Sequence, residues 1–217
     1  MNYYSFFRIN KKGFAYTILS FTNFWISPFL PLYVWIKFRT KNYLAVNLGS
    51  GNRKISGLIN VDGNLFSRPE IWLDCRYGLP FRCNQVDFIY SSHFLEHLTP
   101  ENALALLKES YRCLHAGGRF RIAVPSFSQA IRLLNANDKS KIGKWPRPFD
   151  HLEGLVISFL FCEGEHRFAY GVATLRDFLV QAGFSEEKIQ EQRFGEFSAP
   201  ESIDRDTMAK IVYFENE

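Results

Sequence analysis

The chain has 217 residues, 47% of them hydrophobic, which is enough for one domain with an extension and a sizeable core. Its formal net charge of +4 is only mildly basic, so charge gives no reason to expect nucleic acid as a partner. The four cysteines lie far apart with no C-x-x-C pair. This spacing argues against a zinc ribbon or a disulfide framework and favours a reducing, cytoplasmic compartment.

An aromatic-rich extension at residues 1–42 opens the chain. Its stretch 14–36 carries no charged residue and is long enough to be scored as a membrane span. However, Asn23, Pro28 and Pro31 interrupt it, and basic residues flank both ends. These features favour a segment that enters and leaves the membrane on the same face, and they argue against one that crosses it. We therefore expect peripheral contact with the cytoplasmic face of a membrane or, as the alternative, a lid over the core or a substrate cleft.

The remainder of the chain alternates short apolar runs with helical patterns. Runs typical of strands occur at residues 43–48, 57–62, 70–74, 86–91, 119–125, 189–194 and 208–215. Nearly continuous apolar runs are typical of parallel strands that are covered on both faces. The pattern predicts an α/β fold, with a Rossmann-like sheet of seven mostly parallel strands and helices on both faces.

The clearest helix follows the fourth strand. Thr99 is its expected N-cap, Pro100 occupies the first helical position, and Gly117 is its expected end. Two further helices are predicted at residues 126–135 and 174–183. The first of these three helices lies between the fourth and fifth predicted strands, and the other two lie between the fifth and sixth.

Two connections depart from this regular alternation. Only residues 49–56 separate the first two strands, whereas a parallel crossover normally needs a dozen residues or more. The first crossover helix is therefore expected to be short or missing. The basic, proline-containing stretch 138–150 is expected to be an irregular insertion.

Two glycines and two acids follow the first three strands. Gly49 and Gly51 would let backbone N–H groups approach a ligand, but Lys54 occupies the third glycine position of the dinucleotide motif G-x-G-x-x-G. Asp62 closes the second strand and Asp74 closes the third. Strand-end carboxylates face the crevice where open α/β sheets bind ligands, so ribose and adenine are the expected partners. A solvated or turn-forming Asp is the alternative at each position.

These features occur in the stretches VNLGSG, INVD, LDCRYGLPF, VDFIYSSHFLEHL and YRCLHAGGRFRIAVPS. Together they resemble a class I S-adenosylmethionine-dependent methyltransferase, nearest to small methyltransferases associated with surface-polysaccharide gene clusters. The resemblance covers about residues 43–125 and implies a methyltransferase domain at 43–217. Such an enzyme transfers a methyl group from S-adenosyl-L-methionine by in-line displacement. The implied acceptor is a hydroxyl of a small molecule or a glycan, including a lipid-linked one. The alternative is a non-catalytic, methyltransferase-like scaffold.

The resemblance also implies which residues bind the cofactor, namely Asn47, Gly49, Ser50, Gly51, Asp62, Asp74, Ser91 and Ser92. The loop 49–51 would wrap the methionine part, Asp62 would hold the ribose and Asp74 the adenine. The two serines would line the floor under the sulfonium. Asn47 stands where many relatives carry an acid, and it could still hydrogen-bond the cofactor's amino group.

The stretch HFLEH at 93–97 follows the fourth strand at the methyl end of the cofactor. As H-x-x-E-H it matches a zinc-protease pattern, but it opens directly off an α/β strand. With His166 it is similar to small-RNA 2′-O-methyltransferases, where acid and histidine side chains bind a divalent metal, although an acid stands there in place of His93. The favoured interpretation assigns no metal. In it Glu96 and His97 brace the next helix, and His93 is the catalytic base. The alternative ligand set is His93, Glu96, His97 and His166.

Overall fold

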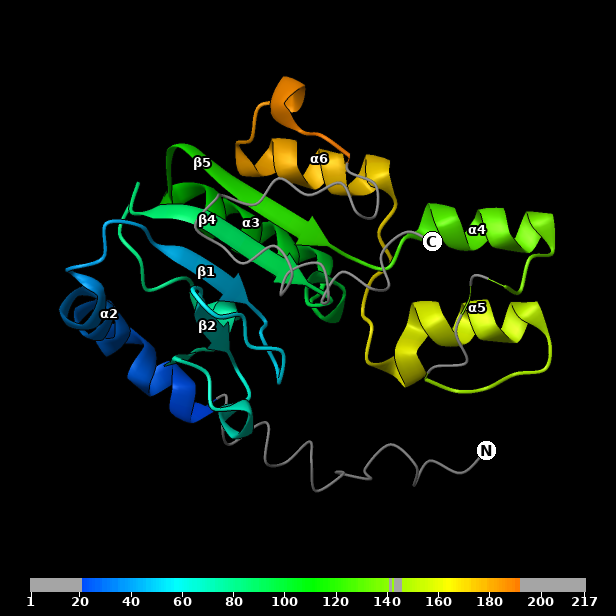
Figure 1. Ribbon diagram of the computed structural model, residues 1–217, viewed down its shortest axis with the longest axis horizontal. Helices are drawn as coiled ribbons and strands as arrows, with labels where there is room; N and C mark the ends of the chain where they lie inside the picture. The colour runs from blue at the N-terminus through cyan, green and yellow to red at the C-terminus, as the bar shows by residue number, and fades with distance from the viewer. Residues whose placement is uncertain (1–20, 141, 143–145, 192–217) are drawn as a thin grey trace.

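The computed structural model describes residues 21–140, 142 and 146–191. Its centre is a sheet of five parallel strands in the order β3-β2-β1-β4-β5 (Figure 1). The strands are β1 (Ala45–Leu48), β2 (Ile59–Asp62), β3 (Ile71–Trp72), β4 (Val86–Ser92) and β5 (Leu114–Ala123). The predicted Rossmann-like α/β fold is confirmed with these five strands. Residues 189–191 do not form a strand, and the rest of the two predicted C-terminal strands lies outside the described residues.

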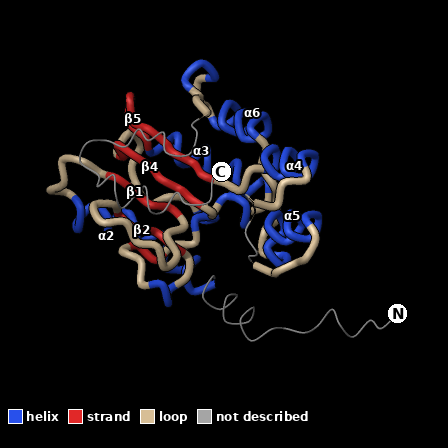
Figure 2. Tube along the Cα trace, turned by 45° about the vertical axis from the view of Figure 1, so that its right-hand side comes forward, coloured by secondary structure: helices blue, strands red, loops and turns tan. Residues whose placement is uncertain are grey.

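The helices are α2 (Leu30–Phe38), α3 (Pro100–Cys113), α4 (Phe127–Ala136), α5 (Leu152–Phe161) and α6 (Val172–Ala182). The chain also forms short 3-10 turns, which are η2 (Ser27–Phe29), η3 (Leu65–Ser67), η4 (Cys75–Tyr77), η5 (Leu95–His97), η6 (Cys162–Gly164) and η7 (Glu186–Lys188). Helices α3 and α6 lie against the β4–β5 half of the sheet, whereas α4 and α5 form a separate pair beyond the strand ends (Figures 1 and 2). The described residues of 138–150 contain neither helix nor strand, as predicted.

The two faces of the sheet have different covers. Val46 and Leu48 belong to the main core, which also contains residues of α2, α3 and α6. Because strand side chains alternate between faces, Ala45 points the other way, into a second cluster with Ile55 and Leu58 of the connecting loop. This loop covers the face where a crossover helix would otherwise lie. The predicted absence of a helix between the first two strands is confirmed.

A hydrogen-bond network around Asn60 holds this loop in place. Its Oδ1 accepts from the N–H of Ile55 at 2.9 Å, and its amide donates to the carbonyls of Ile55 and Leu58 at 3.3 and 3.2 Å. Asn47 donates to the same Oδ1 at 2.9 Å and to the carbonyl of Arg53 at 3.2 Å. Both asparagines are buried. A buried polar group costs free energy unless it is paired. By pairing these groups, the network fixes the loop on the face of the sheet that a crossover helix would otherwise cover.

The boundary between α3 and β5 corrects one prediction. Thr99 caps α3 and Pro100 begins it as expected, but the helix ends at Cys113 and not at Gly117. The strand then starts at once, because Leu114 pairs with Val86, and a register shift follows. Gly117, with φ of 88°, lies inside the resulting bulge. A glycine that the sequence presents as a helix stop thus serves a β-bulge.

The region after β5 contains a helix that the sequence analysis missed. Helix α4 begins behind its N-cap Ser126, as predicted. Helix α5 was not predicted, because its run of apolar residues has no clear helical period, and it buries Leu152 and Val156 against α4 in a small core of their own. Helix α6 begins at Val172, slightly before the predicted start at Thr174.

The described part of the N-terminal extension packs on the β3 edge of the sheet. The Asn23 amide donates to the carbonyl of Trp72 at 3.0 Å and its Oδ1 accepts from the N–H of Asp74 at 2.7 Å, so it occupies edge groups of β3 that a further strand would pair. Helix α2 adds three side chains to the main core, Leu30, Val34 and Phe38. None of the described helices is both long and apolar enough to span a membrane.

Candidate active site at the carboxyl edge of the sheet

The carboxyl ends of β1, β2 and β4 meet at one level. Leu48, the last residue of β1, pairs with Val61 on one side and with Ser91 on the other. The residues that follow these strands therefore emerge side by side at the edge where open α/β sheets bind ligands. This register brings the glycine loop, Asp62 and His93 together.

The glycine loop corrects part of the expectation for its backbone. A Cβ atom at Gly49, where φ is 66°, would lie 2.1 Å from Cγ of Phe94, so the close neighbour that requires glycine here is a protein side chain. The N–H groups of Gly49 and Ser50 both donate to the carbonyl of Val61, at 2.9 and 3.1 Å. Only at Gly51 would an added Cβ meet open space. The sequence suggested free backbone N–H groups at Gly49 and Gly51, but both are already used within the protein, at Gly49 on the carbonyl of Val61 and at Gly51 on Oδ2 of Asp62 at 2.7 Å.

Asp62 is held in a fixed orientation at the end of β2. Its Oδ2 accepts from the N–H of Gly51 at 2.7 Å and its Oδ1 accepts from the N–H of Asn64 at 2.6 Å. An ionised carboxylate has about four acceptor sites, so each oxygen keeps capacity for a ligand hydroxyl. This geometry fits the predicted contact with the two hydroxyls of a ribose.

Asp74 has a more crowded environment than Asp62. Arg76 donates through Nε to both carboxylate oxygens, at 2.9 and 3.1 Å, and its backbone N–H donates to Oδ1 at 3.1 Å. The guanidinium faces the carboxylate as an ion pair, and this hydrogen bond raises the pKa of Arg76. Asp74 therefore already has a cationic partner, and an adenine amino group would share the carboxylate with it.

Two buried hydroxyls at this edge have no hydrogen-bond partner among the described residues, namely Ser50 Oγ and Ser91 Oγ. Buried polar groups in native proteins are nearly always paired, so such orphans indicate a missing polar group. The site fits S-adenosylmethionine in three respects. Gly51 has open space beside it, the carboxylate of Asp62 is fixed, and the hydroxyls of Ser50, after β1, and Ser91, in β4, have no partner among the described residues. Asn47, in contrast, is buried, and its amide already donates to the carbonyl of Arg53 and to Oδ1 of Asn60.

His93 is the first residue after β4. Its backbone has φ of 49°, and its N–H donates to the carbonyl of Ala123 at the end of β5. A non-glycine residue in this region of φ is uncommon and is often found at functional sites. Its Nδ1 lies 3.3 Å from Oε1 of Glu96. The imidazole thus sits at the end of β4 with a carboxylate behind it.

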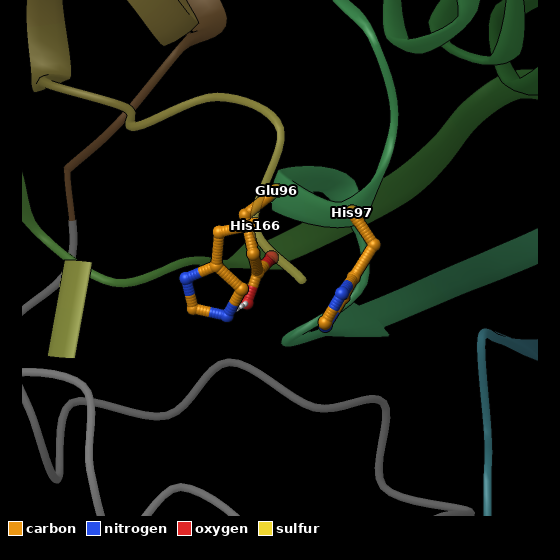
Figure 3. Close-up of side chains that lie close together, drawn as sticks. All are labelled: Glu96, His97 and His166. Carbon is orange, nitrogen blue, oxygen red and sulfur yellow. Dashed lines mark ion pairs between the residues drawn. The ribbon is translucent and has the colours of Figure 1, made fainter. Parts of the chain in front are cut away.

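Figure 3 shows a cluster of three side chains that includes Glu96, the carboxylate 3.3 Å from His93. One ligand-type atom from each of Glu96, His97 and His166 lies within 4.8 Å of the others. Glu96 does not brace α3 as expected, because Thr99 is the cap and neither carboxylate oxygen of Glu96 has a hydrogen-bond partner among the described residues. The interpretation of Glu96 as a helix brace is therefore wrong.

Each of the two histidines of the cluster directs its Nδ1 to a backbone carbonyl. His97 Nδ1 lies 3.2 Å from the carbonyl of Glu165, and His166 Nδ1 lies 2.8 Å from the carbonyl of Leu160. A carbonyl can only accept, so Nδ1 carries the proton in both rings and Nε2 keeps a lone pair. Burial lowers the pKa of His166, which favours its neutral form.

Backbone hydrogen bonds bring the distant His166 to the cluster. The carbonyl of Glu96 accepts from the N–H groups of Arg167 and Phe168, at 2.7 and 3.2 Å. The same segment buries Tyr170, whose hydroxyl has no hydrogen-bond partner among the described residues. Burial and the charge of Glu96 raise the pKa of this hydroxyl, so it stays protonated at neutral pH.

Sequence reasoning missed three residues of this region. Phe94 packs on Gly49, Asn60 holds the loop behind the glycines, and Tyr170 lies buried near Glu96. Phe94 stands inside the HFLEH stretch, but its contact with Gly49 joins positions 45 apart, so the sequence gave no signal for it. Asn60, a polar residue inside an apolar strand, was an available signal. Tyr170 gave no signal, because its position depends on the tertiary fold.

Comparison with known proteins agrees with this geometry. Residues 45–122 match the sequence family described as Methyltransferase domain. The match runs from β1 to the end of β5 and so includes the glycine loop, both strand-end acids and His93. A search of curated proteins found no match.

Solved structures give weaker likenesses. A SAM-dependent methyltransferase from Archaeoglobus fulgidus is 16% identical, with 97% of this chain and 90% of that chain covered and a TM-score of 0.48. A SAM-dependent methyltransferase from Thermotoga maritima is 17% identical, with 74% and 80% covered and a TM-score of 0.40. PigF with SAH is 18% identical, with 74% and 55% covered and a TM-score of 0.41. None of these values is high enough to assign a substrate.

Proposed function

We propose that the chain, of which residues 45–122 match the methyltransferase-domain family, is an S-adenosylmethionine-dependent methyltransferase that methylates a hydroxyl group of a small molecule or a glycan. The observation that carries the proposal is the meeting of Asp62 and His93 at one edge of the sheet, set by the pairing of β1 with β2 and β4. Asp62 would hold a nucleoside ribose at the end of β2, and His93 follows β4, which lies on the other side of β1 and ends at the same level.

The cofactor supplies an electrophilic methyl group on a sulfonium, which is a good leaving group. The chain must therefore position the acceptor in line, and such positioning can contribute about 7–11 kcal/mol to the barrier reduction in favourable cases. We assign Asp62 to the ribose, Asp74 to the adenine side, Gly51 and Ser50 to the methionine part, and Ser91 with Ser92 to the floor of the site. Gly49 and Asn47 act behind this surface, where they shape the loop.

His93 is the proposed base. A hydroxyl nucleophile must lose a proton as its oxygen attacks, and an imidazole has a suitable intrinsic pKa to accept it. Glu96 Oε1, at 3.3 Å from His93 Nδ1, would stabilise the imidazolium that results. In the complete step, the acceptor O–C bond forms, the C–S bond breaks with its electron pair on sulfur, and the proton leaves through His93.

Calorimetry with S-adenosylhomocysteine tests the cofactor site and the rival proposal of a non-catalytic scaffold. The wild-type chain should bind it, and Asp62→Asn, which keeps the shape of the side chain, should weaken binding at least about tenfold because it removes the charge-assisted acceptor. His93→Ala should bind the cofactor normally yet lose methyl transfer. Absence of binding by the folded wild-type chain would favour the scaffold.

The acceptor can be sought directly. Mass spectrometry of surface glycans and lipid-linked sugars from a deletion strain should show one missing methyl group if the acceptor is a glycan. Restoring the strain with the wild-type gene should return the methyl group, and restoring it with His93→Ala should not. An unchanged glycan profile would remove the glycan acceptor and leave small-molecule hydroxyls.

We also propose that the extension contacts a membrane surface. Several large apolar side chains of residues 21–36 are exposed, although α2 buries its opposite side in the core: Phe21, Phe24, Trp25, Phe29, Leu32, Tyr33, Trp35 and Ile36. Lys37, Arg39 and Lys41 follow directly. Aromatic side chains beside basic residues are typical of interfacial segments on anionic lipid. Such a position would bring a lipid-linked acceptor to the enzyme.

Co-sedimentation with vesicles of an anionic and a neutral phospholipid tests this contact. Trp25, 62% exposed, and Phe29, 71% exposed, should both be changed to serine, and the double variant should lose most of the bound fraction. Phe66→Ser is the matched control, because this ring is 78% exposed but lies on η3, outside the extension. Equal sedimentation of all three proteins would contradict the membrane proposal and favour a lid.

A further inference from the structure

We infer that Glu96, His97 and His166 form a binding site for one divalent transition-metal ion at the carboxyl end of β4. The inference deepens the proposed function, because the ion would lie next to the proposed base. It rests on that function only for what the ion would do, and not for whether the ion binds.

The carboxylate of Glu96 is the first reason. The side chain is only 1% exposed, and neither of its oxygens has a hydrogen-bond partner among the described residues. A buried, ionised carboxylate without hydrogen bonds is strongly unfavourable, so native proteins pair such a group or bind a metal with it. The nearest nitrogens belong to His93 at 3.3 Å and His166 at 3.9 Å, and a neutral imidazole does not neutralise the charge.

The orientation of the two histidines is the second reason. His97 and His166 each direct Nδ1 to a backbone carbonyl, which leaves Nε2 free to ligate. Metal-binding histidines almost always donate their second ring N–H to a carbonyl or a carboxylate in this way, because the bond fixes the tautomer and the ring plane. The rings lie edge to face with their centroids 4.9 Å apart, so two ligand nitrogens converge from different segments (Figure 3).

The construction of the site is the third reason. Glu96 and His97 belong to η5, whereas His166 comes from the chain after η6 and is only 5% exposed. The Glu96 carbonyl holds the second segment through the N–H groups of Arg167 and Phe168. The three donor atoms already lie within 4.8 Å of one another, so a small closure would bring them to ligand distance.

The donor set indicates which ions to expect. Two imidazoles and one carboxylate suit zinc, cobalt, manganese or iron in the divalent state, and they leave open positions for a further ligand. An ion there would act as a Lewis acid on an acceptor hydroxyl beside His93. A substrate with two adjacent hydroxyls could fill two open positions, so the site favours a diol, such as a sugar or a catechol, as the acceptor.

Metal binding to the tag-free full chain tests the inference without any activity measurement. After removal of metals with a chelator, the chain should bind one Co²⁺ with visible absorption bands, and Zn²⁺ should displace it. His166→Ala and Glu96→Gln should each weaken Co²⁺ binding by at least about 100-fold, since even loss of an outer-shell partner costs 10–100-fold. The matched control is His115→Ala, a half-exposed histidine whose Nε2 pairs with Asp87 at 2.9 Å and which lies outside the cluster.

Thermal unfolding distinguishes a variant that has lost the metal site from one that fails to fold. Zn²⁺ should raise the melting temperature of the stripped wild-type chain and of His115→Ala, because an ion that binds only the folded state stabilises it. Glu96→Gln should fold at least as well as the stripped wild-type chain, since it removes a buried charge, and it should show no rise with Zn²⁺. An equal rise in all proteins, or none in the wild type, would overturn the inference.

The two proposals can fail separately. The stripped chain should still bind S-adenosylhomocysteine, and Asp62→Asn should still bind Co²⁺. Cofactor binding without Co²⁺ binding by the wild type would overturn the metal site and leave the methyltransferase intact. Co²⁺ binding without cofactor binding would support the metal site and count against the proposed use of Asp62.

Discussion

The two halves of the site are built in different ways. On the proposed cofactor side, the groups around β1 and β2 are backbone atoms and short side chains that hold one another, as Asp62 holds the N–H groups of Gly51 and Asn64. On the proposed acceptor side, Glu96, His97 and His166 are longer side chains from two distant segments. The first half is formed by backbone groups that also hold the fold together, whereas the second is formed by side chains that project from it.

This difference has a consequence for mutation. Where the site is made of backbone, a change in one residue alters the course of the chain and thus its stability. Where the site is made of side chains, truncation removes chemistry and leaves the scaffold in place. Substitutions in the two halves, and one at the β3 edge beside them, should therefore differ in their effect on the free energy of unfolding.

Gly49→Ala should cause the largest loss, about 3–5 kcal/mol, because the new Cβ would clash with Phe94 and the backbone has positive φ. Gly51→Ala is the matched control. It also has positive φ, but its Cβ would meet nothing within 4 Å, so it should lose only about 1 kcal/mol. Urea unfolding of both variants measures the difference. Equal losses would show that Phe94 does not set the requirement for glycine.

Asn60→Ala should come next, with a loss of about 2–3 kcal/mol, because it leaves buried groups of Ile55, Leu58 and Asn47 without partners. Asn64→Ala serves as its control, since that side chain makes one exposed bond to the N–H of Phe66. Cofactor affinity should also fall in the first variant, measured by calorimetry. If the two variants unfold alike, the network does not replace the missing helix.

Asn23→Ala should cost about 1–2 kcal/mol, since it removes two hydrogen bonds from the β3 edge. The change should also increase hydrogen exchange at Asp74, whose N–H donates to this side chain. Ser27→Ala, which removes a bond only within the extension, should leave that amide protected. Unchanged exchange in both would mean that the extension does not protect the edge.

His97→Ala should have the smallest effect on unfolding, below about 1 kcal/mol, because this ring is the most exposed of the cluster and makes one bond to a surface carbonyl. The same variant should nevertheless lose methyl transfer if the cluster serves the acceptor. Chemical denaturation and a labelled-methyl assay give the two values. A large loss of stability would contradict the distinction between the two halves.

The sequence predicted the fold around the glycine loop well because its signals are local. The strands at β1, β2 and β4, the cap at Thr99 and the missing crossover helix all follow from residues close to one another in the chain. The errors have local causes too. Gly117 resembles a helix stop but serves a bulge, and α5 was missed because its apolar residues lack a period.

The acceptor half was harder to predict because it depends on contacts between distant residues. The histidines could be named, yet nothing in the HFLEH stretch shows that Glu96 is buried without partners or that its carbonyl binds the segment after His166. The same limit applies to Gly49, whose role depends on where Phe94 packs.

By itself, the sequence determined the parallel α/β sheet and the order of its chemical groups, since alternation of apolar runs and strand-end residues is a property of short stretches. Only the tertiary structure decided which groups meet. It paired the N–H groups of Gly49 and Ser50 with the carbonyl of Val61 and brought His166 close to Glu96 across 70 positions of the chain. The reason is physical: hydrogen bonding and burial act through space, and a position in the chain does not state what lies beside it.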